Sequence, residues 1–294
     1  MSERRPELEL AAVRVLVGAF ATLYLVVRLP YFAKLDALPA AQLSPVGIAR
    51  VLSSPLPPVA TWAIALVAVV SGIAFTAGRG LRASAPIFFA SFLWVTTYRS
   101  SWGKILHSEN LVALHLGVLA VASLMPRRQS MGAPDPDADA DARWALTTMS
   151  IVTVLTYLVA GIAKLRSGGG GWMSGEALGD WLVFDALRKT ELGSVRSPLA
   201  AVVASRPFLV QILAIGTFLV ELGAPVALVG PRAARVWCAA AWLFHLGILA
   251  TMAIGFFYPL TLVAFSPLLV PTLPRRLHAR CTSFGRLMTP HLRG

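Results

Sequence analysis

The sequence predicts an all-α integral membrane protein with about eight transmembrane helices. Of its 294 residues, 56% are hydrophobic and 14% are charged, and the mean hydropathy is +0.70. Soluble domains carry about 25% charged residues, so this composition suits an apolar solvent. The apolar runs are nearly continuous over about 20 residues rather than alternating, which favours helical spans over a β-barrel.

The expected transmembrane domain covers residues 1–274, and prolines, glycines or basic residues separate most of its apolar runs. Pro225 predicts a kink in the sixth run, and Pro259, Pro267 and Pro271 interrupt the eighth. In chain order, the expected spans are approximately residues 8–27, 59–76, 83–98, 105–125, 144–165, 207–229, 236–252 and 255–273.

The segments between these spans differ in composition. Residues 127–143 contain an acidic, proline-bearing run with nothing to bury, so we expect a disordered cytoplasmic loop. Ser167-Gly-Gly-Gly-Gly171 predicts a hinge. Residues 172–205 are too polar to span the membrane. Their apolar side chains predict an amphipathic helix that lies on the outer face of the cell membrane. Residues 275–294 form a basic cytoplasmic tail.

The net charge of +12 does not indicate nucleic-acid binding, because the basic residues are scattered through short loops and the ends of spans. That distribution is typical of membrane orientation, and anionic lipid headgroups are the expected partners. Eight spans place both termini on the same side, which collects most of these cations. We therefore expect a multi-pass protein of the cell membrane with both termini in the cytoplasm.

Lys164 ends the fifth apolar run and shares one helical face with Tyr157 and Gly161, at spacings of i, i+4 and i+7. A glycine lets a neighbouring helix approach closely, and such a helix would cover the lysine stem. Two interpretations are open. Lys164 marks the membrane edge with its ammonium in the headgroups, or it is a functional cation between packed helices.

Other titratable side chains fall inside the expected spans, where such groups are costly and tend to mark functional sites. His107 and His115 share one stripe, from which Glu109 points away; His245 shares another stripe with Trp242. By the predicted topology, His107, Lys164 and His245 lie in the outer half and are candidates for one cavity.

Each of these residues also has a purely structural interpretation. His107 suits the membrane interface, and His115 suits a hydrogen bond between helices. Glu221 suits a protonated carboxyl against a neighbouring helix or a counter-ion to a buried cation. His245, in the middle of a span, is the hardest to explain structurally. Since no ligands fall at a chelating spacing, we expect no metal.

Several short motifs, in order, resemble the membrane domain of vitamin K-dependent gamma-carboxylase and its bacterial relatives, the horizontally transferred transmembrane (HTTM) domain. The resemblance runs from Ser101 to about Leu269. The matching residues are Ser101-Trp102, His107-Ser108, Ala160-Gly161-Ile162-Ala163-Lys164-Leu165, Trp172-Met173-Ser174-Gly175, Glu221-Leu222-Gly223-Ala224, Phe244-His245, Ile254-Gly255-Phe256-Phe257 and Ser266-Pro267-Leu268.

The resemblance implies a chemistry. In the carboxylase, the lysine that matches Lys164 acts as the base on reduced vitamin K, which oxygen then converts to an epoxide together with a strong base. That base removes a proton from a glutamate side chain, and the carbanion takes up carbon dioxide. A lysine is suited to this role when it is neutral, and burial between packed helices favours the neutral form.

Carried over to this chain, the resemblance makes Lys164, His107 and His245 the candidate catalytic residues. His107, His245, Tyr157 and Trp242 are the candidate binding residues for a reduced quinone of the vitamin K or menaquinone type. Glu221 is expected to be a counter-ion or proton relay, and His115 is a further candidate.

The sequence leaves two candidate functions, which belong to different classes of protein. The first is a membrane enzyme that oxidises a reduced quinone with oxygen and uses the resulting base to modify, and in one version carboxylate, a peptide or small substrate. The second is a non-enzymatic membrane scaffold or maturation partner for a secreted peptide or a membrane protein. The second is motivated by the surface segment at residues 172–205 and by the carboxylase's large substrate-binding domain, which we do not expect in this chain. A transporter is disfavoured, because the two halves of the sequence show no repeat.

Overall fold

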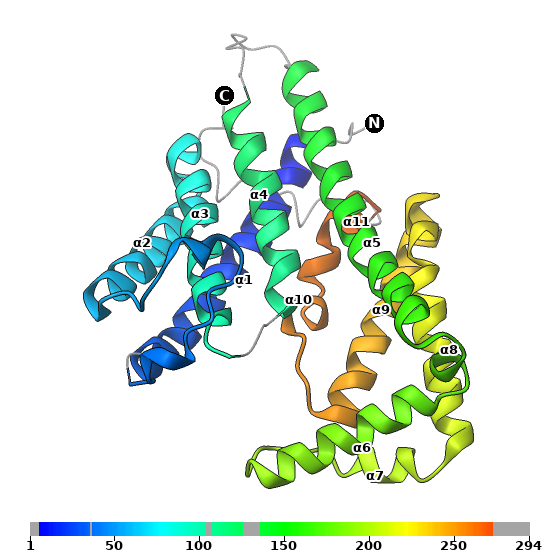
Figure 1. Ribbon diagram of the computed structural model, residues 1–294. Coiled ribbons are helices and arrows are strands. Elements are labelled where there is room, and N and C mark those ends of the chain that lie inside the picture. Colours follow the sequence, from blue (N-terminus) through cyan, green and yellow to red (C-terminus); the bar gives the residue numbers. More distant parts are fainter. Residues whose placement is uncertain (1–5, 36, 104–106, 126–135, 273–294) are drawn as a thin grey trace. The chain divides into compact units, whose positions relative to one another are not determined.

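The chain folds into helices (Figure 1), as the sequence predicts. The computed structural model describes residues 6–35, 37–103, 107–125 and 136–272, and these contain no strand. They form two compact units, one from the described residues up to Met149 and the other from Ser150 to Thr272.

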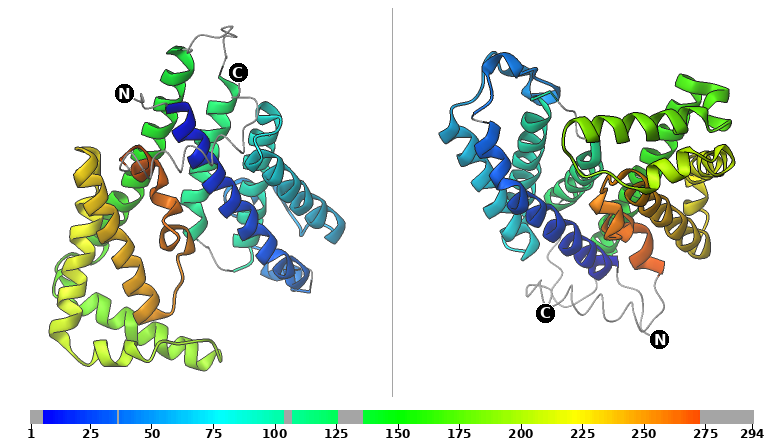
Figure 2. Two further views of the ribbon diagram at one scale, coloured as in Figure 1. Left: turned by 180° about the vertical axis from the view of Figure 1, so that it is seen from behind. Right: turned by 90° about the horizontal axis from the view of Figure 1, so that it is seen from below.

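The first unit is built from antiparallel apolar helices. Helix α2 packs along α1 and α3, and α4 packs against α3 and α1, so that α1, α2 and α3 lie side by side (Figure 2). Its core holds Phe75, Phe88 and Phe92. The Phe88 ring centroid lies 5.7 Å from that of Phe75 and 6.0 Å from that of Phe92. Its elements are α1 (Pro6–Leu35), η1 (Ala40–Gln42), η2 (Gly47–Val51), α2 (Pro58–Thr76), α3 (Leu81–Ser100), η3 (His107–Glu109), α4 (Asn110–Leu124) and the first part of α5 (Pro136–Met173).

The second unit begins at Ser150, within α5. Helices α8 and α9 pack against each other, and α6 runs across their ends rather than along them (Figure 1). The elements after α5 are α6 (Glu176–Glu191), α7 (Leu199–Ala204), α8 (Pro207–Leu222), η4 (Ala224–Leu228), α9 (Pro231–Met252), α10 (Phe257–Leu260), η5 (Val263–Phe265), α11 (Ser266–Leu269) and η6 (Val270–Thr272).

Helix length and composition support a membrane protein. In the described part of the chain, four helical stretches are long and apolar enough to cross a membrane: Pro6–Phe32, Pro58–Thr76, Ala138–Met173 and Pro231–Met252. Shorter apolar helices cover Asn110–Leu124, Pro207–Leu222 and Val263–Thr272. The count of eight spans and the cytoplasmic placement of the termini stay predictions, and the expected basic tail at 275–294 lies outside the described residues.

The structure corrects one sequence-based expectation and agrees with another. The disordered loop expected at residues 127–143 is wrong from Pro136 onward, because α5 begins there. Proline is tolerated in the first turn of a helix, and acidic residues such as Asp139 favour a helix N-terminus. The interruptions expected in the eighth run are present, because residues 257–272 form four short helical segments. Proline lacks the amide hydrogen that a continuous helix requires.

Candidate functional site

Lys164 forms an ion pair with Glu221 inside the second unit. The Lys164 Nζ donates a hydrogen bond to Glu221 Oε1, joining α5 to the last turn of α8. The Lys164 side chain is 23% exposed and the Glu221 side chain is 4% exposed. The ammonium is therefore partly covered and has a counter-ion, which is the geometry that the counter-ion interpretation of Glu221 requires.

Gly161 permits this contact, as its position in the sequence predicts. A Cβ atom at Gly161 would lie 2.8 Å from Leu222 Cδ2 and 3.0 Å from Glu221 Cβ. Any larger side chain would therefore push α8 away from α5. The expected close approach of a second helix beside the lysine is confirmed.

The glycine-rich segment after Lys164 turns the chain back over the lysine. Gly169 has φ 45° and ψ −121°, which breaks the helical geometry inside α5 and supports the expected hinge. Trp172 follows, and its ring centroid lies 5.6 Å from Lys164 Nζ, within the range of a cation–π contact. Gly175 then adopts φ 90°, and a Cβ there would lie 2.8 Å from the backbone nitrogen of Gln211 on α8. The Trp-x-x-Gly motif thus supplies a ring that covers the ammonium and a turn that packs against α8.

Tyr157, on the same face of α5 as Lys164, forms a buried hydrogen-bonded pair with His245. The Tyr157 hydroxyl lies 2.7 Å from His245 Nε2, which joins α5 to α9. The Tyr157 ring meets Trp237 edge-on at 5.0 Å, and Phe256 lies 5.2 Å from the imidazole. We call Lys164, Glu221, Trp172, Tyr157 and His245 the lysine site.

Two buried polar atoms of the lysine site have no hydrogen-bond partner among the described residues. They are Glu221 Oε2 and His245 Nδ1. Leaving a buried polar atom unsatisfied costs about 1–3 kcal/mol. Such atoms are suited to a ligand that can both donate and accept hydrogen bonds.

The structure does not bring every predicted residue into this site. Trp242 donates from Nε1 to the Leu260 carbonyl at 3.0 Å, so its polar atom is already used within the second unit. His115 is fully buried in the first unit, and its Nε2 lies 3.3 Å from the Met149 carbonyl. That contact matches the helix-to-helix interpretation. The side chain of His107 lies outside the described part, so its role stays a prediction.

Sequence reasoning missed a buried charged cluster in the first unit, made of Tyr24, Arg99 and Glu109. The Glu109 carboxylate accepts hydrogen bonds from the Tyr24 hydroxyl and the Arg99 guanidinium. Arg99 is 7% exposed and Glu109 is 3% exposed. The sequence contained a signal for this cluster. Tyr24 lies near the end of the first expected span, Arg99 directly follows the third, and Glu109 lies near the start of the fourth. The predicted topology places these three positions on the same side of the membrane.

Comparison with known proteins identifies the family. The model of the HTTM domain matches residues 6–272, which is most of the chain. No curated protein and no solved structure matches. Among the residues that the structure describes, no group of three or more histidine, cysteine or acidic side chains is arranged to hold a metal ion. Because the family match covers most of the chain, the chain belongs to the HTTM domain family, which includes the membrane domain of the vitamin K-dependent gamma-carboxylase.

Proposed function

We propose that this protein is a membrane enzyme that oxidises a reduced quinone with oxygen and uses the resulting base to modify a peptide or small substrate. The observation that carries the proposal is the lysine site, in which one helix, α5, contributes to both an ion pair and a Tyr–His pair within one unit. Family membership supports the same chemistry. When bound, a reduced quinone supplies the electrons that reduce oxygen.

Lys164 and Glu221 are suited to act together as the base. A lysine accepts a proton only after it has lost its own, and Glu221 Oε1 is the nearest acceptor for that proton. Transfer along this hydrogen bond therefore frees the amine of Lys164 to take a proton from a bound hydroxyl.

His245 is suited to bind a quinone in both of its redox states. If the Tyr157 hydroxyl donates to Nε2, then Nδ1 carries the hydrogen and donates to a carbonyl oxygen. If Nε2 donates to Tyr157, then Nδ1 accepts from a hydroxyl. The unpartnered state of Nδ1 and of Glu221 Oε2 among the described residues fits a group with two such oxygens.

Helix α6 is suited to bring a peptide or a lipid-borne substrate near the site. It carries the exposed apolar side chains Trp181, Phe184 and Leu187, which are 53%, 56% and 60% exposed. It also crosses α8 and α9, as a helix in the membrane plane crosses transmembrane helices (Figure 1). The same face favours the second candidate function, a scaffold that holds a secreted peptide or a membrane protein without chemistry.

The two functions are separated by what the protein retains and consumes. We expect protein purified in a mild detergent to contain extractable quinone and, after chemical reduction of added menaquinone, to take up oxygen at the quinone's expense. A stoichiometric protein partner, with neither bound quinone nor quinone-dependent oxygen uptake, would support the scaffold and contradict the enzyme.

A further inference from the structure

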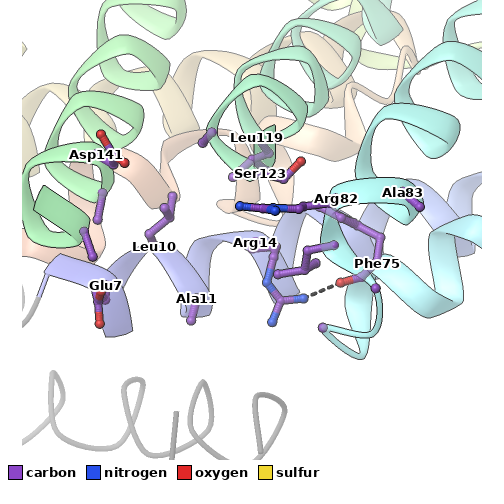
Figure 3. A pocket seen from close by; sticks show the side chains of 16 residues that line it. Glu7, Leu10, Ala11, Arg14, Phe75, Arg82, Ala83, Leu119, Ser123 and Asp141 are labelled. Carbon is purple, nitrogen blue, oxygen red and sulfur yellow. Dashed lines mark hydrogen bonds between the residues drawn. The ribbon is translucent and has the colours of Figure 1, made fainter. Parts of the chain in front are cut away.

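A cavity in the first unit plays no part in the proposed chemistry. It has a volume of about 500 Å³ and lies where α1, α4 and α5 meet the turn between α2 and α3 (Figure 3). Leu10, Phe75, Leu81 and Leu119 supply apolar lining. This volume is within the range of about 300–1,000 Å³ that small-molecule sites occupy.

The cavity is lined by charges of both signs. Arg14 and Arg82 line it together with Glu7 and Asp141, so the formal charges of the lining sum to zero. Figure 3 shows both carboxylates at one side and Arg82 reaching across toward them. A purely anionic ligand would meet these carboxylates, whereas a zwitterion places each charge against its opposite.

Of the two arginines, Arg82 is the one available to a ligand. Arg14 donates from Nη1 to the Phe75 carbonyl and, at 2.9 Å, to the Thr76 carbonyl. Its guanidinium is therefore already bound to the carbonyl groups at the C-terminal end of α2. Arg82 makes no hydrogen bond or ion pair with any described residue. It stands in the first turn of α3, which no side chain caps, and the amides there add to the attraction for a phosphate.

The position of the cavity indicates the source of its ligand. Helices α1 and α5 begin here, α2 and α4 end here, and each contains a candidate span or a shorter apolar helix. Membrane-crossing helices begin and end at the depth of the lipid headgroups. A lipid headgroup is therefore the natural occupant, with its chains along the apolar helices.

We propose that this cavity binds the headgroup of a phospholipid that carries a primary ammonium, as in phosphatidylethanolamine. The phosphate lies against Arg82 and the first turn of α3, and the ammonium lies against Asp141 and Glu7. A choline headgroup fits less well, because its quaternary nitrogen has no hydrogen to donate to these carboxylates. A glycerol headgroup lacks the positive charge.

The test is native mass spectrometry of the full chain in detergent, with phosphatidylethanolamine, phosphatidylglycerol or phosphatidylcholine of matched acyl chains. Arg82→Gln and Asp141→Asn are compared with Arg79→Gln and Asp139→Asn, which remove charges beside the cavity that do not line it. Arg82 is exposed, so its replacement leaves the fold intact. Water-soluble glycerophosphoethanolamine is the competitor that separates a lipid from a free phosphate compound.

The wild-type chain should retain phosphatidylethanolamine in preference to the other two lipids. Arg82→Gln should weaken its binding about tenfold, the effect of one lost charge-assisted hydrogen bond. Asp141→Asn should abolish the preference over phosphatidylglycerol, and both controls should match the wild type. Equal binding by Arg82→Gln and Arg79→Gln, a preference for phosphatidylglycerol in the wild type, or equally tight binding of the soluble competitor would each overturn the proposal.

Discussion

Lys164 and Glu221 lie 57 residues apart in the sequence, yet their side chains form an ion pair where α5 meets α8. The carboxylate is almost fully covered, and the ammonium is covered on one side by the Trp172 ring. The Glu221 carboxylate therefore depends on Lys164 to stabilise its negative charge, and the pair is the centre of the lysine site. This dependence can be measured separately from any catalytic activity.

The first prediction concerns the stability of the pair. Lys164→Met leaves a buried carboxylate without its partner, and we expect a loss of about 2 kcal/mol in the free energy of unfolding, less than for a fully buried pair because Lys164 reaches solvent. Adding Glu221→Leu should recover most of the loss. Thermal unfolding of both variants in one detergent measures this, and equal melting temperatures for the single and double variants would argue against the pair.

The second prediction concerns the approach of α8 to Gly161. Gly161→Leu should separate the helices and lower the melting temperature by several degrees, because the new side chain overlaps Leu222 and Glu221. Gly216→Leu, on α8 itself, is the control, since a Cβ at that position has no heavy atom within 4 Å. A control that unfolds as readily as Gly161→Leu would show that the close approach is unimportant.

The third prediction concerns the buried cluster of the first unit. Glu109→Leu leaves Arg99 buried without its carboxylate, so we expect a loss of about 3 kcal/mol in stability. Tyr24→Phe removes two hydrogen bonds to charged groups, one donated to Glu109 and one accepted from Arg99, and should cost about 2 kcal/mol. Thermal unfolding again gives the values. If Glu109→Leu were as stable as the wild type, the cluster would have no structural role.

The fourth prediction concerns the orientation of His245. Tyr157→Phe removes the hydrogen bond to Nε2 and frees the ring to turn, so the affinity for a reduced quinone should fall about tenfold. Tyr98→Phe, a buried tyrosine of the first unit, is the matched control. Quenching of intrinsic fluorescence by menaquinone measures both affinities. An unchanged affinity in Tyr157→Phe would remove His245 from the quinone site.

The sequence predicts most helices well, but it does not predict which side chains pair between helices. The expected spans at 59–76 and 83–98 match α2 and α3 within about two residues, because apolar runs and the glycine turn define their ends. Helical periodicity also placed Tyr157, Gly161 and Lys164 on one face. Lys164 and Glu221 were both candidates, but their pairing depends on which helices pack together, and one sequence does not contain that information.

Glu109 shows the same limit more sharply. Its helical position points away from the histidine stripe, so helical periodicity alone does not mark it as part of a site. Its partner Tyr24 is 85 residues away and comes from a different helix, so periodicity within one span does not reveal it. The start of α5 was missed for another reason. An acidic run with prolines has the composition of a disordered segment, yet the same residues stabilise a helix N-terminus.

The most direct test of the central claim is oxygen uptake by purified Lys164→Ala with reduced menaquinone. Lys189→Ala is the control, because Lys189 also forms an ion pair, with Asp185 Oδ2 at 2.7 Å, but lies outside the lysine site. We predict quinone-dependent oxygen uptake in the wild type and in Lys189→Ala, and its loss by at least about 100-fold in Lys164→Ala. Uptake by Lys164→Ala at the wild-type rate would contradict the role of Lys164 as the base.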